Sequence, residues 1–231
     1  MGYCSRSRAA ILIKGNHVTV NGRPVGDPES PVRIPHDRIA IDGAALERAA
    51  LVYLVMNKPR NVVTTASDEQ GRATVYDLLD GESPWLAPVG RLDKASERLL
   101  LLTNDPEWAA GIANPSSQLD KVYHAQVDCV AQADLLAKMV RGCKVDGELL
   151  RAKRVRVLRH GDKNSWLEIV LHEGKNRQIR RLLRALRVQV IRLVRVSIGP
   201  LELGDLKKGA VRQLTRKDKQ SLDEAMRRKG R

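Results

Sequence analysis

Residues 90–106 read GRLDKASERLLLLTNDP, and this stretch decides the fold class. Its four consecutive leucines at 99–102 are typical of a strand that is buried on both faces of a sheet. Asp105 and Pro106 then supply an N-cap and a first-turn proline, which predict a helix ending near Ala113. Asp93 comes shortly before the strand, so we expect it at the mouth of the sheet.

Further strands and helices alternate along the rest of the chain. Apolar runs predict strands at residues 52–56, 122–129, 155–157, 166–171 and 191–198. Helices are predicted at residues 131–140 and after Gly174. Because strands outnumber helices and their order follows no repeat, we predict an α+β fold, with a mixed, largely antiparallel sheet and flanking helices.

The first 43 residues predict a small separate unit. Ser5 can cap a helix that runs to Lys14. Asn21 and Gly22 lie between two short alternating strands, as is typical of a two-residue hairpin turn, and residues 38–42 predict another strand. We therefore predict a basic module at 1–43, a linker at 44–50, a larger domain at 51–216 and a basic, frayed tail at 217–231.

The charge of the chain points to a polyanionic partner. Its 231 residues include 41 lysines and arginines against 27 acidic residues, a formal net charge of +14, which favours nucleic acid. No apolar run approaches the roughly 20 residues of a membrane span, and no signal peptide is visible. Three cysteines without close spacing indicate reduced thiols in a cytoplasmic protein, and no metal-binding motif appears.

An arginine-rich helix is expected after Gly174. Its apolar residues recur at helical spacing and define one face: Ile179, Leu182, Leu183 and Leu186. Its arginines occupy the remaining positions: Arg177, Arg180, Arg181, Arg184 and Arg187. The only acid near them in sequence is Glu173, so the arginines either bind phosphate groups or form a solvated basic surface. From the residues alone, both interpretations stay open.

Several polar residues have ordinary structural interpretations when they are taken one at a time. A turn or a helix cap explains Asp93, and core packing explains Tyr123, which lies on an alternating strand. His124 and His172 have no nucleophile or paired carboxylate beside them in sequence, and we interpret them as structural.

Five blocks closely resemble, in order and spacing, the bacterial ribosomal pseudouridine synthases. They are NKP at residues 57–59, GRLDKASERLLLLTND at 90–105, KVYHAQV at 121–127, EGKNRQIRRL at 173–182 and IGPLELGDLKKGAVRQLT at 198–215. Five blocks in order are far more specific than any one of them. Residues 1–43 resemble the αL RNA-binding module that precedes the catalytic domain in many members of this branch.

The resemblance implies an isomerase that converts uridine in ribosomal RNA to pseudouridine. The N-glycosidic bond breaks, the base turns, and its carbon 5 bonds to the ribose. The nucleotide must be extruded into a pocket at a cost of about a few kcal/mol, which phosphate contacts offset. No redox change or net hydrolysis occurs, so the resemblance implies no cofactor. We expect a monomer that acts on ribosomal RNA, of the large subunit rather than the small.

The resemblance also implies roles for individual residues. Asp93 matches the family's essential carboxylate, which attacks the sugar or removes a ribose proton, and Tyr123 matches the ring that stacks on the target base. Arg180 matches the basic residue that pairs with the carboxylate, with Arg177 as second choice. Leu183 matches an apolar residue under the base, although its place in the apolar stripe favours core packing. The predicted RNA contacts are Arg6, Arg8, Lys14, Arg91, Lys94, Lys175, Arg177 and Arg181.

The chain departs from the family pattern at two places. Arg98 stands where the family usually has glycine, so a backbone that needs positive φ would be strained, and we expect reduced but not abolished function. The N-terminal module usually has another helix upstream of the stretch at residues 4–6, so we expect either that the true start lies upstream or that the module is shortened. Two alternatives stay open: a non-catalytic RNA-binding or ribosome-assembly factor with this fold, and the same chemistry on transfer RNA.

Overall fold

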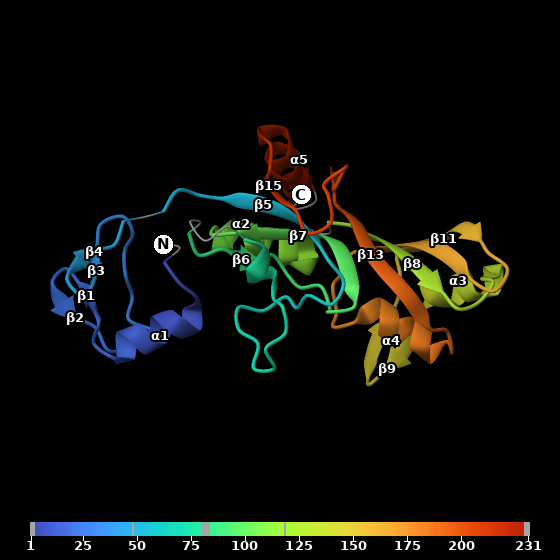
Figure 1. Cartoon of the computed structure of the whole chain (residues 1–231), viewed down its shortest axis with the longest axis horizontal. Coiled ribbons are helices and arrows are strands. Elements are labelled where there is room, and N and C mark those ends of the chain that lie inside the picture. Colours follow the sequence, from blue (N-terminus) through green and yellow to red (C-terminus); the bar gives the residue numbers. More distant parts are fainter. Residues whose placement is uncertain (1–2, 48, 80–83, 118, 229–231) are drawn as a thin grey trace.

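The computed structural model describes residues 3–47, 49–79, 84–117 and 119–228. Residue 48 of the predicted linker and residues 229–231 of the predicted tail lie outside this range. A small N-terminal unit and a larger domain lie side by side along the long axis, joined by an extended segment (Figure 1). Among the described helices, none combines the length and the apolar content that crossing a membrane requires.

The N-terminal unit consists of α1 (Arg6–Lys14) and a four-stranded sheet. The strands, in the spatial order β2–β1–β3–β4, are β2 (Arg23–Pro24), β1 (Val18–Val20), β3 (Ile39–Ile41) and β4 (Ala44–Ala45). Ser5 caps α1 as predicted, because its hydroxyl accepts a hydrogen bond from the backbone N–H of Arg8. Asn21 and Gly22 have φ of 52° and 79°, which confirms the predicted two-residue turn between β1 and β2.

Strand β4 lies where the linker was expected to begin, and the cause is local. Asp42 and Gly43 have φ of 48° and 82°, so they form a second tight turn that folds the chain back onto β3. The prediction that residues 44 and 45 belong to the linker was therefore wrong, and the N-terminal sheet extends to Ala45.

The larger domain is built on a nine-stranded sheet. Its strands are β5 (Tyr53–Lys58), β6 (Ala87–Pro88), β7 (Ser96–Thr103), β8 (Lys121–Val127), β11 (Arg154–His160), β12 (Ser165–Leu171), β13 (Val190–Ile198), β14 (Leu201–Glu202) and β15 (Val211–Gln213). The main order is β11–β12–β8–β13–β7–β5–β15, with β14 beside β13 and β6 beside β7. Strands β7 and β13 run parallel and the other described pairs run antiparallel, so the predicted mixed, largely antiparallel sheet is confirmed.

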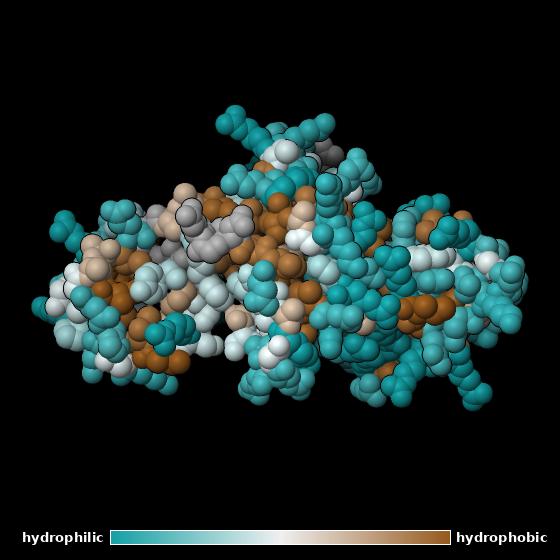
Figure 2. All heavy atoms as spheres, in the orientation of Figure 1, coloured by the Kyte–Doolittle hydropathy of each residue, from teal (hydrophilic) through white to brown (hydrophobic). Residues whose placement is uncertain are grey.

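Helices flank this sheet, and a short hairpin lies beside them. The helices are α2 (Pro106–Ala113), α3 (Ala133–Arg141), α4 (Gln178–Ala185) and α5 (Arg216–Arg228); the hairpin is β9 (Cys143–Val145) with β10 (Glu148–Leu150). On the face seen in Figure 2, hydrophilic side chains cover α5 and much of the half that carries β11 and β13, and apolar side chains reach the surface over α2 and β7.

The leucine run of β7 is buried on both faces, as its sequence predicts. Leu100 and Leu102 belong to the larger apolar cluster, which includes Leu182 of α4. Leu99 and Leu101 point to the other face, into a second cluster that includes Trp108 of α2. All four leucines are fully buried, so β7 ties the two cores together.

The predicted frayed tail is instead helix α5, and that expectation was wrong. Leu222 of α5 is fully buried in the second cluster, with Ala225 and Met226 beside it at helical spacing. The indole N–H of Trp108 also donates to the carboxylate of Asp223, at 2.8 Å. A few apolar positions in a strongly basic stretch are thus enough to dock the helix on α2.

Removing the buried side chain of Leu222 tests this docking. Leu222→Ala should lower the free energy of unfolding by about 2–5 kcal/mol, because it leaves a cavity in the second core. Urea denaturation measures the change. The matched control is Leu149→Ala, whose side chain is 45% exposed, with an expected change within about 0.5 kcal/mol. Equal stability of the two variants would exclude α5 from the core.

Candidate active site

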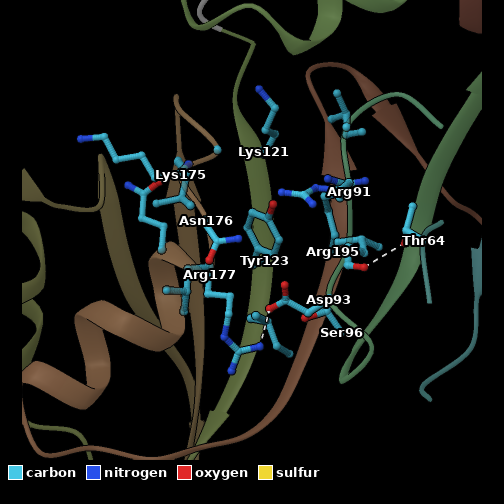
Figure 3. A pocket seen from close by; sticks show the side chains of 18 of the residues that line it. Thr64, Arg91, Asp93, Ser96, Lys121, Tyr123, Lys175, Asn176, Arg177 and Arg195 are labelled. Atoms are coloured by element: carbon cyan, nitrogen blue, oxygen red, sulfur yellow. Dashed lines mark hydrogen bonds and ion pairs between the residues drawn. The ribbon is translucent and has the colours of Figure 1, made fainter. Parts of the chain in front are cut away.

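A pocket opens between the turn before β7, the strands β8 and β13, and the segment that leads into α4. It has a volume of about 420 Å³, and Asp93, Tyr123, Arg177 and Arg195 are among its lining residues (Figure 3). These residues come from four separate parts of the sequence. The topology of the sheet therefore brings them together.

A buried lysine holds the turn that carries Asp93. Lys58, at the end of β5, is fully buried, and its Nζ donates to the carbonyl oxygens of Pro59 at 3.0 Å, Ser96 at 3.0 Å and Asp93 at 3.3 Å. Burial lowers the pKa of Lys58 to about 8, while Glu97 and Asp93 oppose this shift. The backbone of Asp93 is fixed by these bonds, and its carboxylate remains directed into the pocket (Figure 3).

Two arginines flank the carboxylate of Asp93, with different contacts. Nη1 of Arg177 donates to Oδ2 of Asp93 at 3.2 Å, and the Arg177 side chain is 50% exposed. Nε of Arg180 lies 3.8 Å from the same oxygen without a hydrogen bond, and that side chain is 14% exposed. The geometry thus makes Arg177, the second choice from the sequence, the direct partner, and makes Arg180 a second, buried cation beside it.

The remaining bonds of Arg180 hold the walls of the pocket. Its Nη1 donates to the carbonyl oxygen of Val190 and its Nη2 to that of Ala95, so it joins β13 to the Asp93 turn. Burial lowers the pKa of Arg180, and Arg177 lowers it further, while Asp93 opposes the shift. Arg177 precedes the first residue of α4 and has φ of 47°, a left-handed conformation that directs the chain into the helix.

Tyr123 lies on β8 with its ring beside Asp93 (Figure 3). The side chain is 9% exposed, packs on the larger core and lines the pocket. The core interpretation of Tyr123 is therefore confirmed, and the ring also lines the pocket; its stacking on a base stays a prediction.

Comparisons with known proteins identify the family. Residues 52–185, more than half of the chain, match the family model described as RNA pseudouridylate synthase. The chain belongs to the RNA pseudouridylate synthase family. Residues 1–39 match the S4 domain, which confirms the N-terminal resemblance.

Relatives and a solved structure agree with the family assignment. The chain is 37% identical to ribosomal large subunit pseudouridine synthase B of Bacillus subtilis (strain 168), over 93% of this chain and 88% of that protein. It is 34% identical to an uncharacterized RNA pseudouridine synthase of Aquifex aeolicus (strain VF5), over 97% and 91% respectively. A crystal structure of a pseudouridylate synthase matches with a TM-score of 0.67 and 28% identity, over 94% of each chain. The protein is thus a pseudouridine synthase, an isomerase, with an RNA-binding S4 domain.

Some residues predicted to contact RNA in this synthase do lie at the pocket mouth. Arg91 lines the pocket and is exposed, and Lys94 is exposed next to Asp93. Lys175 also lines the pocket, and its Nζ donates to the carbonyl oxygen of Leu149 at 2.9 Å. The three N-terminal candidates are exposed on α1, in the separate unit (Figure 1): Arg6, Arg8 and Lys14.

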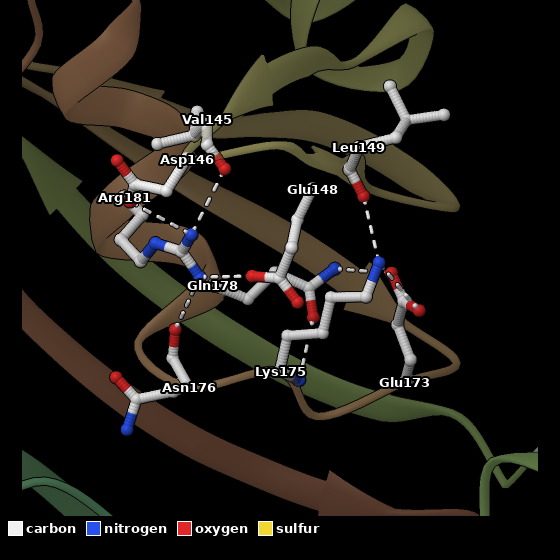
Figure 4. Close-up of polar contacts among 9 residues, drawn as sticks. All are labelled: Val145, Asp146, Glu148, Leu149, Glu173, Lys175, Asn176, Gln178 and Arg181. Carbon is white, nitrogen blue, oxygen red and sulfur yellow. Dashed lines mark hydrogen bonds and ion pairs between the residues drawn. The ribbon is translucent and has the colours of Figure 1, made fainter.

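Arg181 turns away from the pocket to the β9–β10 hairpin. Its guanidinium pairs with Glu148 at 2.7 Å and Asp146 at 3.1 Å, and it also donates to the carbonyl oxygen of Val145 (Figure 4). The expectation that Glu173 is the only acid near these arginines was wrong, because the hairpin supplies two more from another part of the sequence. Arg181 thus fastens the hairpin to α4.

Leu183 contributes to the core and not to the pocket lining. It is fully buried, and the residues of α4 that line the pocket are Gln178 and Ile179, about one turn earlier. The alternative that the apolar stripe favoured, core packing, therefore describes Leu183 in this structure.

Three buried lysines and arginines near the reacting residues were not predicted: Lys58, Lys121 and Arg195. Lys58 and Lys121 lie within the blocks NKP and KVYHAQV, so the family resemblance could have indicated them. Their residue type and spacing alone give no reason to single them out. Arg195 has a clearer signal. It occupies an inward position in the apolar strand β13, where a charged residue is costly unless it has a partner.

Arg98 has φ of 78°, which confirms that this position needs a backbone conformation that favours glycine. The residue lies in β7, opposite Lys58 of β5 and beside Arg195 of β13. The strain is therefore located on the strand that continues from the Asp93 turn.

Glycine should relieve this strain. Arg98→Gly should be more stable than Arg98→Ala by about 1 kcal/mol, because alanine keeps the Cβ that penalises positive φ and glycine does not. Both variants remove the same guanidinium, so the comparison isolates the backbone. Thermal and urea unfolding measure the difference, and a more stable alanine variant would show that Arg98 is not strained.

Proposed function

We propose that this synthase modifies ribosomal RNA, with large-subunit RNA as its substrate and Asp93 as its catalytic carboxylate. The observation that carries the proposal is the placement of the Asp93 carboxylate in a pocket, beside the ring of Tyr123 and next to two guanidinium groups. Support for the RNA class comes from the large-subunit enzyme of Bacillus subtilis, which shares 37% identity.

The pocket supports a mechanism on an extruded nucleotide. The uracil stacks on Tyr123, and the ribose lies against Asp93. Asp93 attacks C1′ or removes the C2′ proton while the C1′–N1 bond breaks. The freed base turns, and C5 bonds to C1′ as the Asp93–C1′ bond breaks or as C2′ regains its proton from Asp93. The proton of C5 is then lost as N1 regains one. The product is an isomer of the substrate, so no oxidant, reductant or water is consumed.

The basic surface supports the binding step. Arg91 and Lys94 are exposed at the mouth of the pocket, and the S4 domain adds the exposed cations of α1. Phosphate contacts from both regions offset the cost of extruding the base. The proposal also includes a cytoplasmic monomer: its three cysteines are free thiols, which is typical of proteins in reducing compartments.

Replacing the carboxylate of Asp93 tests the proposal. Asp93→Asn should abolish isomerisation, by on the order of a thousandfold or more, and leave the affinity for RNA nearly unchanged. The assay incubates ribosomal RNA from a deletion strain with the protein and maps pseudouridine by carbodiimide-dependent reverse-transcription stops.

Three outcomes of this map would contradict parts of the proposal. Full activity of Asp93→Asn would reject Asp93. Modification of small-subunit or transfer RNA alone would reject the substrate class. Tight RNA binding without any modification by the wild-type protein would favour the non-catalytic assembly factor.

Separate substitutions distinguish the two arginines. Arg177→Ala should lower the rate about 10- to 100-fold, the worth of one charge-assisted hydrogen bond, with little change in stability, because its side chain is half exposed. Arg180→Ala should lower both the rate and the free energy of unfolding, the latter by about 2–3 kcal/mol, because two carbonyl groups lose their donor. Single-turnover kinetics and urea unfolding of both variants measure this. A stable, fully active Arg180→Ala variant would leave Arg177 as the sole partner of Asp93.

A further inference from the structure

The pocket contains two buried cations that the mechanism above does not use. Lys121 is 7% exposed and Arg195 is 4% exposed, and both line the pocket. Arg195 on β13 stands directly opposite Tyr123 on β8, and Lys121 lies two residues before Tyr123 on the same face of β8. Figure 3 shows both residues beside the ring of Tyr123, with Arg195 on the Asp93 side. The Asp93 carboxylate and both buried cations thus lie around the ring of Tyr123 in one pocket.

These two cations are incompletely satisfied. Nε of Arg195 donates to the carbonyl oxygen of Leu99 at 2.8 Å, but its buried Nη2 has no hydrogen-bond partner among the described residues. Nζ of Lys121 has a single long bond of 3.3 Å, to the carbonyl oxygen of Leu119. The nearby acid is Asp120, and its carboxylate already bonds Lys153 and His172. Burial lowers the pKa of Lys121, and the charge of Arg195 lowers it further.

Such an arrangement indicates a ligand that carries oxygen atoms and negative charge. Removing a cation from water costs about several kcal/mol, and an incompletely satisfied one keeps that cost until a partner arrives. Two neighbouring cations also repel each other. An electron-rich oxygen between them would relieve both costs.

The target nucleotide offers two such groups, its phosphates and its base. A phosphate in RNA continues into a neighbouring nucleotide on each side, so it belongs at the open mouth, where Arg91 and Lys94 are exposed. The base is a side group with a free end and can reach the buried part of the pocket. Stacking on Tyr123 directs its carbonyl edge to the strand neighbours of that ring, Arg195 and Lys121.

We propose that Lys121 and Arg195 bind the carbonyl oxygens of the target uracil and stabilise the charge that the base acquires when it leaves the ribose. When C1′–N1 breaks, the electron pair stays on N1 and the negative charge spreads to O2 and O4. The ribose is satisfied by an ester bond from Asp93 or by transfer of its C2′ proton to Asp93. The charge on the base disappears when C5 bonds to C1′. The two cations thus act as an oxyanion site for a leaving group. This inference rests on the proposed function, with Asp93 as the reacting carboxylate.

The test compares two leaving groups in one RNA sequence. Arg195→Gln and Lys121→Met remove each charge and keep much of the side-chain length. Single-turnover reactions use an RNA that contains the target uridine or 5-fluorouridine, and nuclease digestion with mass spectrometry follows loss of the starting nucleoside. Fluorine withdraws electrons and stabilises the departing anion. It therefore replaces part of the stabilisation of negative charge that Lys121 or Arg195 would supply. Filter binding gives the affinity, urea unfolding confirms the fold, and Lys163→Gln, in an exposed turn, is the matched control for charge removal.

The expected result is a rate on uridine about a hundredfold lower for each variant, and a rate on 5-fluorouridine only about tenfold lower, at nearly unchanged affinity. Equal losses on both substrates would overturn the proposal, since the cations would then only position other groups. A weaker affinity with a normal saturated rate would overturn it in favour of a phosphate site. If Arg195→Gln does not fold, the test uses Lys121→Met and the charge-retaining Arg195→Lys. The quantity compared is the same, the rate loss on uridine divided by the rate loss on 5-fluorouridine. Failure of the proposed function is distinguishable from failure of this inference, because the wild-type protein itself would then leave both uridine and 5-fluorouridine unchanged.

Discussion

The active site depends on a lysine that is removed entirely from water. Lys58 ends the strand β5, and its ammonium group donates to three backbone carbonyl groups, two of which belong to the turn that carries Asp93. A carboxylate partner would have neutralised the lysine and would also have competed for Arg177 and Arg180. Carbonyl groups satisfy the ammonium without adding an anion. The turn is fixed by a cation, and among the described residues that line the pocket the only acid is Asp93, which we propose as the reacting carboxylate.

Arg177 and Arg180, the two arginines beside Asp93, differ in burial and therefore in role. Arg180 lies inside and holds two backbone carbonyl groups, so its position is set whether or not RNA is bound. Arg177 lies at the mouth and is half exposed, so it is the one that RNA can reach. Its left-handed backbone takes it off the helical face on which the periodicity of α4 would place it. This explains why helical spacing alone could not rank the two arginines.

Local sequence patterns predicted the elements whose causes are local. The leucine run of β7, the Asp105 cap of α2 and the turn at Asn21 each depend on neighbouring residues, and each appears where its pattern indicates. Strand β4 was missed although its cause, the turn at Asp42 and Gly43, is local, whereas helix α5 has its partners elsewhere in the chain. Helix α5 forms because Leu222 finds a core made by other elements, and no local feature of a basic stretch reveals that core.

The same distinction applies to the candidate site. The blocks that resemble the family indicated Asp93 and Tyr123, and the structure puts both in one pocket. The role of Arg181 could not be read from its helix, because its two acidic partners come from the β9–β10 hairpin. Contacts between residues far apart in the sequence were therefore the ones that could not be predicted, whereas the types of residue at the site could be.

The electrostatics of the pocket resolve two opposing needs. A protein that binds a polyanion requires positive charge, but this reaction also requires an ionised carboxylate near the ribose. In the proposed mechanism a single acid among cations meets both needs: Arg177 and Arg180 flank Asp93, and the buried pair Lys121 and Arg195 lines the same pocket. The surrounding positive charge also attracts the RNA. Backbone carbonyl groups accept the hydrogen bonds of Arg180 and Arg195, so among the described residues no carboxylate is hydrogen-bonded to these two guanidinium groups and their charge remains available to the nucleotide.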